Sequence, residues 1–301
     1  MTAKQDDNPG RKLKLRKSII TFLQFASLIA LLTFVISRID PEEVMEAMTQ
    51  FSAQAIVASV ALHVLIIILL SWRFLVVFQE ERSATHAVLD VYRITFGATL
   101  ANLLLPTALL GDAGRVWLMR RRGVETRLAV KIGVSDRLAG LVALALAAAI
   151  GAVAAPMLVP DGLAELALLL FVVLSVALWF FLPASETMRK AGMFVGLLIA
   201  LSLLGHVAAT IISYLLLQSA GETVSMIALL AIFPAMLLAA AIPVSVGGWG
   251  SREFAAMVSL PMIGIDQDIA VAMSIMFGLT QVAAAAFGLA ILTLLSRRAA
   301  S

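Results

Sequence analysis

The sequence predicts an all-α, polytopic membrane protein with six full spans and two re-entrant hairpins. Of its 301 residues, 61% are hydrophobic and only 14% are charged, whereas soluble domains carry about 25% charged residues. Several apolar runs have roughly the 20 residues that a helix needs to cross a bilayer. Two further apolar runs are interrupted by a proline and a glycine-rich turn. A soluble globular protein is therefore excluded.

The first two spans follow a basic tail. Residues 1–17 carry six lysines and arginines, and an apolar run from Ser18 to Ser37 comes next. No small-residue cleavage site follows that run, so we interpret it as a retained helix and not as a signal peptide. Basic flanks stay in the cytoplasm, which places the acidic segment Arg38–Gln50 outside. A second span from Ala55 to Phe78 then returns the chain to the cytoplasm.

Four later runs are also of spanning length. They are Leu138–Ala155, Leu163–Leu182, Gly192–Leu217 and Ile269–Leu295. Basic pairs lie between the second and third of these runs and after the last, where the positive-inside rule expects cytoplasm. Six crossings leave both termini inside. Residues 18–296 are thus predicted to form one transmembrane domain between a cytoplasmic tail and a cytoplasmic C-terminus, residues 297–301.

The first interrupted stretch, Val88–Gly123, is predicted to be a hairpin that enters from the cytoplasm and turns near Pro106. A full crossing would place seven basic residues outside, against the positive-inside rule. They are Arg115, Arg120, Arg121, Arg122, Arg127, Lys131 and Arg137. Asn102 lies one helical turn before Pro106, where its side chain is predicted to bond backbone that the turn frees.

The second interrupted stretch, Val224–Leu260, begins on the outer side. If it also turns back, Asp266 and Asp268 are external and the last helix ends inside. Residues 224–242 are long enough to span alone, so this half of the topology stays open. Pro234 favours a break, although membrane helices tolerate proline.

The two hairpins share the spacing P-x4-G-x3-R, which ends at Arg115 in the first and at Arg252, 137 residues later, in the second. The predicted halves, residues 18–156 and 163–296, start on opposite sides. This pattern is typical of an inverted-topology repeat with a substrate site near the midplane; chance coincidence in a glycine-rich chain is the alternative. The expected turn residues are Pro106, Gly111, Gly114, Pro243, Gly247, Gly248 and Gly250.

The polar residues around these turns are the candidate substrate-binding residues. A helix that begins after such a turn favours an anion at its N-terminus, and Arg115 and Arg252 carry planar forks suited to phosphate. Asp112 and Glu253 either pair with arginines in a gate or bind a cationic head group, or they form structural ion pairs or helix caps. The remaining candidates are Asp136 and Arg137, for which capping and anchoring of a span is slightly favoured, and Trp249, which is placed to contact a lipid.

Other chemistries find little support in the sequence. The chain has no cysteine, and His63, His86 and His206 lack ligand spacing, so no metal site and no cofactor are expected. The net charge is +3, and most of the basic residues border apolar runs. This placement is typical of residues that set membrane orientation and does not indicate nucleic-acid binding. No P-loop is present, so ATP hydrolysis is not expected.

Three motifs occur in order: LLPTALLGDAGRVWLMRRRG, VSDRLAGL at residues 134–141, and IPVSVGGWGSREF at residues 242–254. Together they resemble the membrane region of lysylphosphatidylglycerol synthases and related stand-alone flippase-like proteins, and the resemblance covers almost the whole chain after Ser18. Family members commonly have a second glycine where this chain has Leu110. The resemblance implies a lipid flippase-like fold whose members move aminoacylated phospholipids or handle polyprenyl-linked and other glycolipids.

The resemblance leads us to expect a transporter of a lipid with a charged or glycosylated head group in the cytoplasmic membrane of a prokaryote. The bifunctional synthases carry a C-terminal aminoacyl-transferase domain, whereas this sequence stops at Ser301, so we expect no lipid aminoacylation. The expected partners are membrane lipids, with a separate lipid-modifying synthase or glycosyltransferase as a further candidate. Two alternatives remain. The protein is either an intramembrane enzyme that uses Asp112 or Glu253 as an acid or base, or a non-transporting assembly partner of a glycosyltransferase or lipid synthase. The sequence leaves the oligomeric state open.

Overall fold

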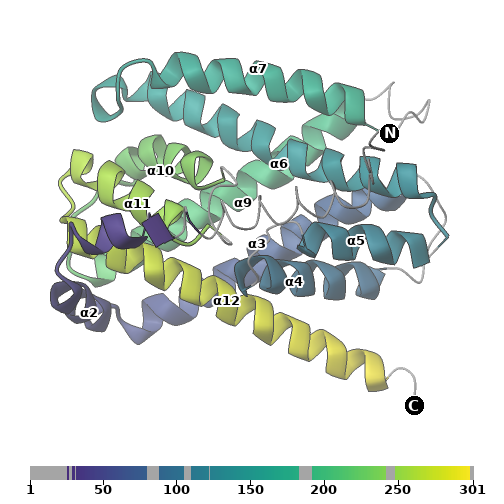
Figure 1. The fold of residues 1–301 in the computed structure, drawn as a ribbon, viewed down its shortest axis with the longest axis horizontal. Coiled ribbons are helices and arrows are strands. Elements are labelled where there is room, and N and C mark those ends of the chain that lie inside the picture. The colour runs from purple at the N-terminus through teal and green to yellow at the C-terminus, as the bar shows by residue number, and fades with distance from the viewer. Residues whose placement is uncertain are drawn as a thin grey trace, which may run out of the picture.

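A computed structural model describes residue 26 and residues 29–30, 32–79, 88–104, 110–121, 123–182, 192–241 and 248–298, and all regular structure in this part is helical (Figure 1). The α-helices are α2 (Pro41–Gln50), α3 (Ala53–Gln79), α4 (Val88–Leu104), α5 (Leu110–Arg121), α6 (Thr126–Ala154), α7 (Leu163–Phe181), α9 (Gly192–Ser219), α10 (Met226–Ala240), α11 (Ser251–Ser259) and α12 (Gln267–Arg298). Two short 3-10 helices are η1 (Pro156–Leu158) and η2 (Leu260–Ile263). The all-α prediction is confirmed.

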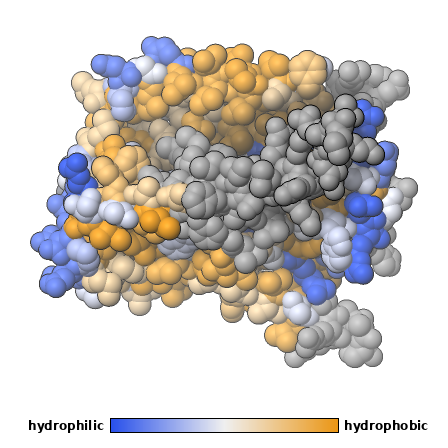
Figure 2. Space-filling view, viewed as in Figure 1, coloured by the Kyte–Doolittle hydropathy of each residue, from blue (hydrophilic) through white to orange (hydrophobic). Residues whose placement is uncertain are grey.

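Five helices of the described part are long and apolar enough to cross a membrane, namely α3, α6, α7, α9 and α12. They correspond to five of the six predicted spans, and most of the first, residues 18–37, lies outside the described residues. Figure 2 shows hydrophilic residues at the two ends of the visible face and mostly hydrophobic surface between them. The protein is therefore a polytopic α-helical membrane protein.

The two interrupted stretches form helical hairpins. Helix α4 packs against α5 and α10 packs against α11. With 17 and 15 residues, α4 and α10 are about 25 Å and 22 Å long, less than the roughly 30 Å of a hydrocarbon core. Figure 1 shows the α4–α5 hairpin in one half of the molecule and the α10–α11 hairpin in the other.

The first hairpin differs from its prediction at two glycines. Gly111 and Gly114 were expected in the turn but lie in the first two turns of α5. Gly111 is needed for close packing instead, because a Cβ there would overlap the carbonyl oxygen of Ala98 on α4. Its N–H donates to Asn102 Oδ1 at 2.9 Å, which confirms that Asn102 bonds backbone freed at a helix start.

The second hairpin keeps its predicted turn glycines where they are described. Gly248 and Gly250 have φ of +84° and +82°, a conformation that residues with a Cβ rarely adopt. Gly250 is the residue directly before α11 and is its N-cap. Pro106, Pro243 and Gly247 lie outside the described residues.

Helix α6 corrects a further prediction. It begins at Thr126, twelve residues before the predicted span, so Asp136 and Arg137 lie well inside it. Asp136 is 1% exposed and is the eleventh residue of the helix. It therefore does not cap the N-terminus, which was the slightly favoured prediction. Ion pairing, described below, is what permits this charge in the interior.

Candidate functional site

Two adjoining cavities lie between the hairpins, with volumes of about 380 Å³ and 270 Å³. We call them the Arg115 cavity and the Arg252 cavity after the hairpin arginine that lines each, and together the polar cavity. Arg73 of α3, His206 of α9 and Gln281 of α12 line both. The Arg115 cavity also has Thr99, Asn102, Asp112, Asp136 and Arg137 in its wall. Charged and polar side chains thus project into a cavity whose wall is otherwise largely apolar.

Asp136 is the centre of a buried ion-pair network. Arg73 donates from Nε and Nη2 to its two carboxylate oxygens at 2.7 and 3.1 Å, the bidentate geometry that guanidinium groups favour. Arg115 Nη1 adds a bond of 3.1 Å to Oδ2. Arg73 also donates to the hydroxyl of Ser202 on α9 at 2.7 Å. The network therefore joins α3, α5, α6 and α9.

A second ion pair lies nearer the surface on the same side. Arg137 Nη1 donates to Asp112 Oδ2 at 2.6 Å, and the Arg137 side chain is 43% exposed. Arg115 Nη1 is 3.9 Å from the other oxygen of Asp112. Asp112 therefore lies between one buried and one exposed guanidinium. This pairing fits both a gate and a structural ion pair, the two interpretations of Asp112 that the sequence left open.

The second hairpin builds a comparable cluster around Glu253. One carboxylate oxygen accepts from Arg252 Nη2 at 2.9 Å and from the Ser274 hydroxyl at 3.1 Å. The other accepts from the N–H of Gly250 at 2.6 Å. Glu253 is therefore both an ion-pair partner and the cap of α11, the two roles that the structural interpretation gave it, and its pairing with Arg252 also fits a gate.

Trp249 connects the hairpins to each other. Its indole Nε1 donates to the carbonyl oxygen of Leu103, near the end of α4, at 3.0 Å. The Arg252 guanidinium lies 4.9 Å from its ring centroid, a cation–π distance. A Cβ at Gly278 of α12 would overlap Arg252 Nη2, so this glycine makes room for the arginine.

The described part of the site carries unbalanced charge. Four guanidinium groups, those of Arg73, Arg115, Arg137 and Arg252, face the three carboxylates of Asp112, Asp136 and Glu253. The excess of one positive charge favours an anionic group such as phosphate.

The sequence matches the family described as lysylphosphatidylglycerol synthase TM region over residues 19–288. The chain belongs to this family. No curated protein sequence matches the chain. The family match confirms the expectation that the three motifs raised.

In this member of the lysylphosphatidylglycerol synthase TM region family, sequence reasoning missed Arg73. It is 5% exposed and is the bidentate partner of Asp136, yet it sits six residues before the end of an apolar helix. A hydropathy average over such a run hides a single arginine. The usable signal was its charge, because ionisable residues inside spans are rarely without a role.

Two histidines of this family member line the polar cavity. His63 Nδ1 is 3.1 Å from the carbonyl oxygen of Ser59, and its Nε2 has no hydrogen-bond partner among the described residues. His206 Nε2 is 3.3 Å from the carbonyl oxygen of Gly140. In the described part, no three His, Cys, Asp or Glu side chains gather in a way that could hold a metal ion, and His86 lies outside that part.

Proposed function

We propose that the protein is a flippase-like transporter that moves a lipid with a charged or glycosylated head group across the cytoplasmic membrane of a prokaryote. The observation that carries the proposal is the polar cavity. Arg115 and Arg252 reach it from two different hairpins, and apolar spanning helices surround it. Such a cavity offers a head group a polar path across a region that otherwise excludes charge.

The contacts of the two arginines support related halves. Arg115 donates to Asp136 on α6, and Arg252 donates to Ser274 on α12 at 3.1 Å. Each acceptor lies on the long helix that follows its hairpin, and the acceptors are 138 residues apart, against 137 for the arginines. Two halves in opposite orientations provide two equivalent gates for alternating access.

We propose transport in preference to intramembrane catalysis. General acid–base chemistry needs a carboxyl group that reaches the substrate and exchanges a proton. Asp112, Asp136 and Glu253 are each paired with a guanidinium. Their arrangement suits a gate of ion pairs that a lipid phosphate opens by competing for the arginines.

Reconstitution tests the proposal. Purified protein in phosphatidylglycerol vesicles should accelerate movement between leaflets of a chain-labelled fluorescent phosphatidylglycerol, measured as the fraction bleached by external dithionite. The acceleration should not require ATP. Absence of acceleration for anionic, aminoacylated and polyprenyl-phosphate probes would contradict transport, and a new lipid product in mass spectra would favour an enzyme.

A further inference from the structure

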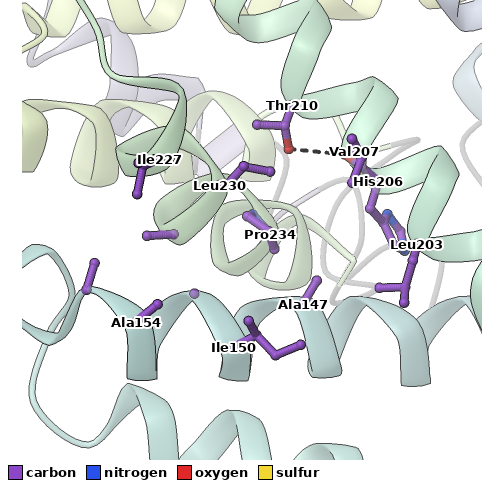
Figure 3. Close-up of a pocket in the computed structure, with 13 residues that line it drawn as sticks. Ala147, Ile150, Ala154, Leu203, His206, Val207, Thr210, Ile227, Leu230 and Pro234 are labelled. Carbon is purple, nitrogen blue, oxygen red and sulfur yellow. Dashed lines mark hydrogen bonds between the residues drawn. The ribbon is translucent and has the colours of Figure 1, made fainter.

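A third cavity, here called the apolar chamber, lies between α6, α9 and α10 (Figure 3) and has a volume of about 320 Å³. Each helix contributes one face, with residues three or four positions apart. The faces are Ala147, Ile150 and Ala154 of α6, Leu203, Val207 and Thr210 of α9, and Ile227, Leu230 and Pro234 of α10. The volume falls within the range of small-molecule pockets.

The chamber wall suits hydrocarbon. The Thr210 hydroxyl donates to the backbone oxygen of His206 at 3.1 Å, so its only hydrogen is already used. The other side chains of the wall, apart from the His206 ring, are apolar. At the rim, Ile150 is 59% exposed and Ile227 is 73% exposed, so the chamber opens to the surface that faces lipid. Water gains little in a cavity of this chemistry.

The chamber adjoins the polar cavity, and the two share one wall residue. His206 lines the chamber and both parts of the polar cavity. It lies halfway along α9, whereas the chamber follows α6 from Ala147 toward Ala155, away from the end that carries Arg127. A polar and an apolar space thus meet at mid-depth, with the apolar one directed away from the arginine-rich end.

We propose that the apolar chamber holds a hydrocarbon chain of the same lipid whose head group occupies the polar cavity. This inference rests on the proposed transport function. It describes the substrate as an amphiphilic lipid whose head group and hydrocarbon chain bind in two adjoining cavities. In the described state, the chain points away from the arginine-rich end. A lipid that enters from the leaflet at the arginine-rich end has the same orientation, because its hydrocarbon chain points from that leaflet surface toward the middle of the membrane.

Photocrosslinking tests the proposal on the full chain. The probe is phosphatidylglycerol with a diazirine in one acyl chain, in phosphatidylglycerol and phosphatidylcholine vesicles, and adducts are mapped by mass spectrometry. We expect adducts on the chamber faces of α6, α9 and α10. Arg115→Ala with Arg252→Ala should lower their yield by at least about tenfold, since the loss of a single charge-assisted bond already weakens binding to that degree. Adducts on the exposed α12 residues Ala286 and Phe287 should not change, which also reports that the variant is folded.

A filling substitution gives an independent measurement. Ala147→Trp should abolish the chamber adducts, whereas Ala286→Trp on the exposed face of α12 should leave them. Chamber adducts that keep their yield in the double arginine variant would identify bulk lipid and overturn the proposal. If the chamber adducts depend on the two arginines but the protein moves no lipid between leaflets, transport is refuted and chain binding in the chamber stands. If the protein moves lipid but these adducts are absent, chain binding in the chamber is refuted and transport stands.

Discussion

At the residue scale, the two arginines that hold Asp136 are not equivalent. Arg73 donates to both carboxylate oxygens, while Arg115 donates to one. If Arg115 is lost, Asp136 keeps a bidentate partner, but if Arg73 is lost the carboxylate retains one bond. We therefore propose Arg73 as the structural partner of Asp136 and Arg115 as the arginine that a lipid phosphate recruits.

We therefore expect Arg73→Ala and Arg115→Ala to have opposite profiles. Breaking a buried pair costs about 3–5 kcal/mol, so Arg73→Ala should lower the melting temperature strongly. Arg115→Ala removes one charge-assisted bond, about 1.5–3 kcal/mol, and should mainly reduce lipid movement. Thermal unfolding in detergent and the dithionite assay measure the two effects. Equal destabilisation by both substitutions would contradict the assignment of roles.

Outside the membrane-spanning helices, Glu43 of α2 gives a prediction on pH. The carboxylate of Asp268, and then that of Asp40, raise the pKa of Glu43. An acid whose pKa is raised by folding destabilises the fold when it is ionised, so its effect appears as the pH rises through that pKa. Glu43→Gln should slightly raise the melting temperature at pH 7, and the gain should vanish at about pH 4. Glu46→Gln removes the same charge elsewhere on α2 and is the control; an equal gain there would contradict the local cause.

At the element scale, hydropathy located five spans but misplaced the start of α6, and the proline-glycine spacing misplaced two glycines of the first hairpin. A hydropathy window ends at a charge, yet Asp136 stays inside a helix because Arg73 and Arg115 neutralise it. A proline-glycine spacing predicts a turn, yet Gly111 serves close packing against α4. Both errors arise from long-range partners that a local pattern does not contain.

Trp249 gives a prediction about the contact between hairpins. Trp249→Phe keeps an aromatic ring beside Arg252 but removes the bond from Nε1 to the Leu103 oxygen, worth about 1 kcal/mol. We expect a small fall in melting temperature and faster lipid movement, because one contact between the hairpins is lost. Trp117→Phe on the exposed face of α5 is the matched control. Unchanged lipid movement in Trp249→Phe would contradict a gating role for this contact.

At the scale of the whole molecule, the sequence identified most of the residues that form the ion pairs, but only the structure showed how they come together. Arg115, Asp112, Arg252 and Glu253 were predicted from one repeated spacing and its neighbours. Arg115 and Asp112 line one of two adjoining cavities and Arg252 lines the other. This arrangement depends on where α3, α9 and α12 pack, which spacing does not encode. The apolar chamber was missed for the same reason, since its three faces look like ordinary lipid-facing or packing surface in sequence.

The predicted orientation can be tested because the chain contains no cysteine. Arg121 ends α5 and Asp266 precedes α12, at opposite ends of the molecule (Figure 1). In intact cells, Arg121→Cys should resist an impermeant maleimide until the membrane is opened, whereas Asp266→Cys should react directly. Labelling of the first variant in intact cells would overturn the re-entrant topology.

We propose that Arg115 and Arg252 together carry the anionic head group through the polar cavity, and a variant that lacks both arginines tests this role. Arg115→Ala with Arg252→Ala is compared with Arg120→Ala with Arg121→Ala, which removes two charges from the exposed end of α5. In phosphatidylglycerol vesicles containing equal amounts of folded protein, the first pair should abolish accelerated lipid movement and the second should preserve it. Undiminished lipid movement by a folded Arg115→Ala, Arg252→Ala protein would contradict the account.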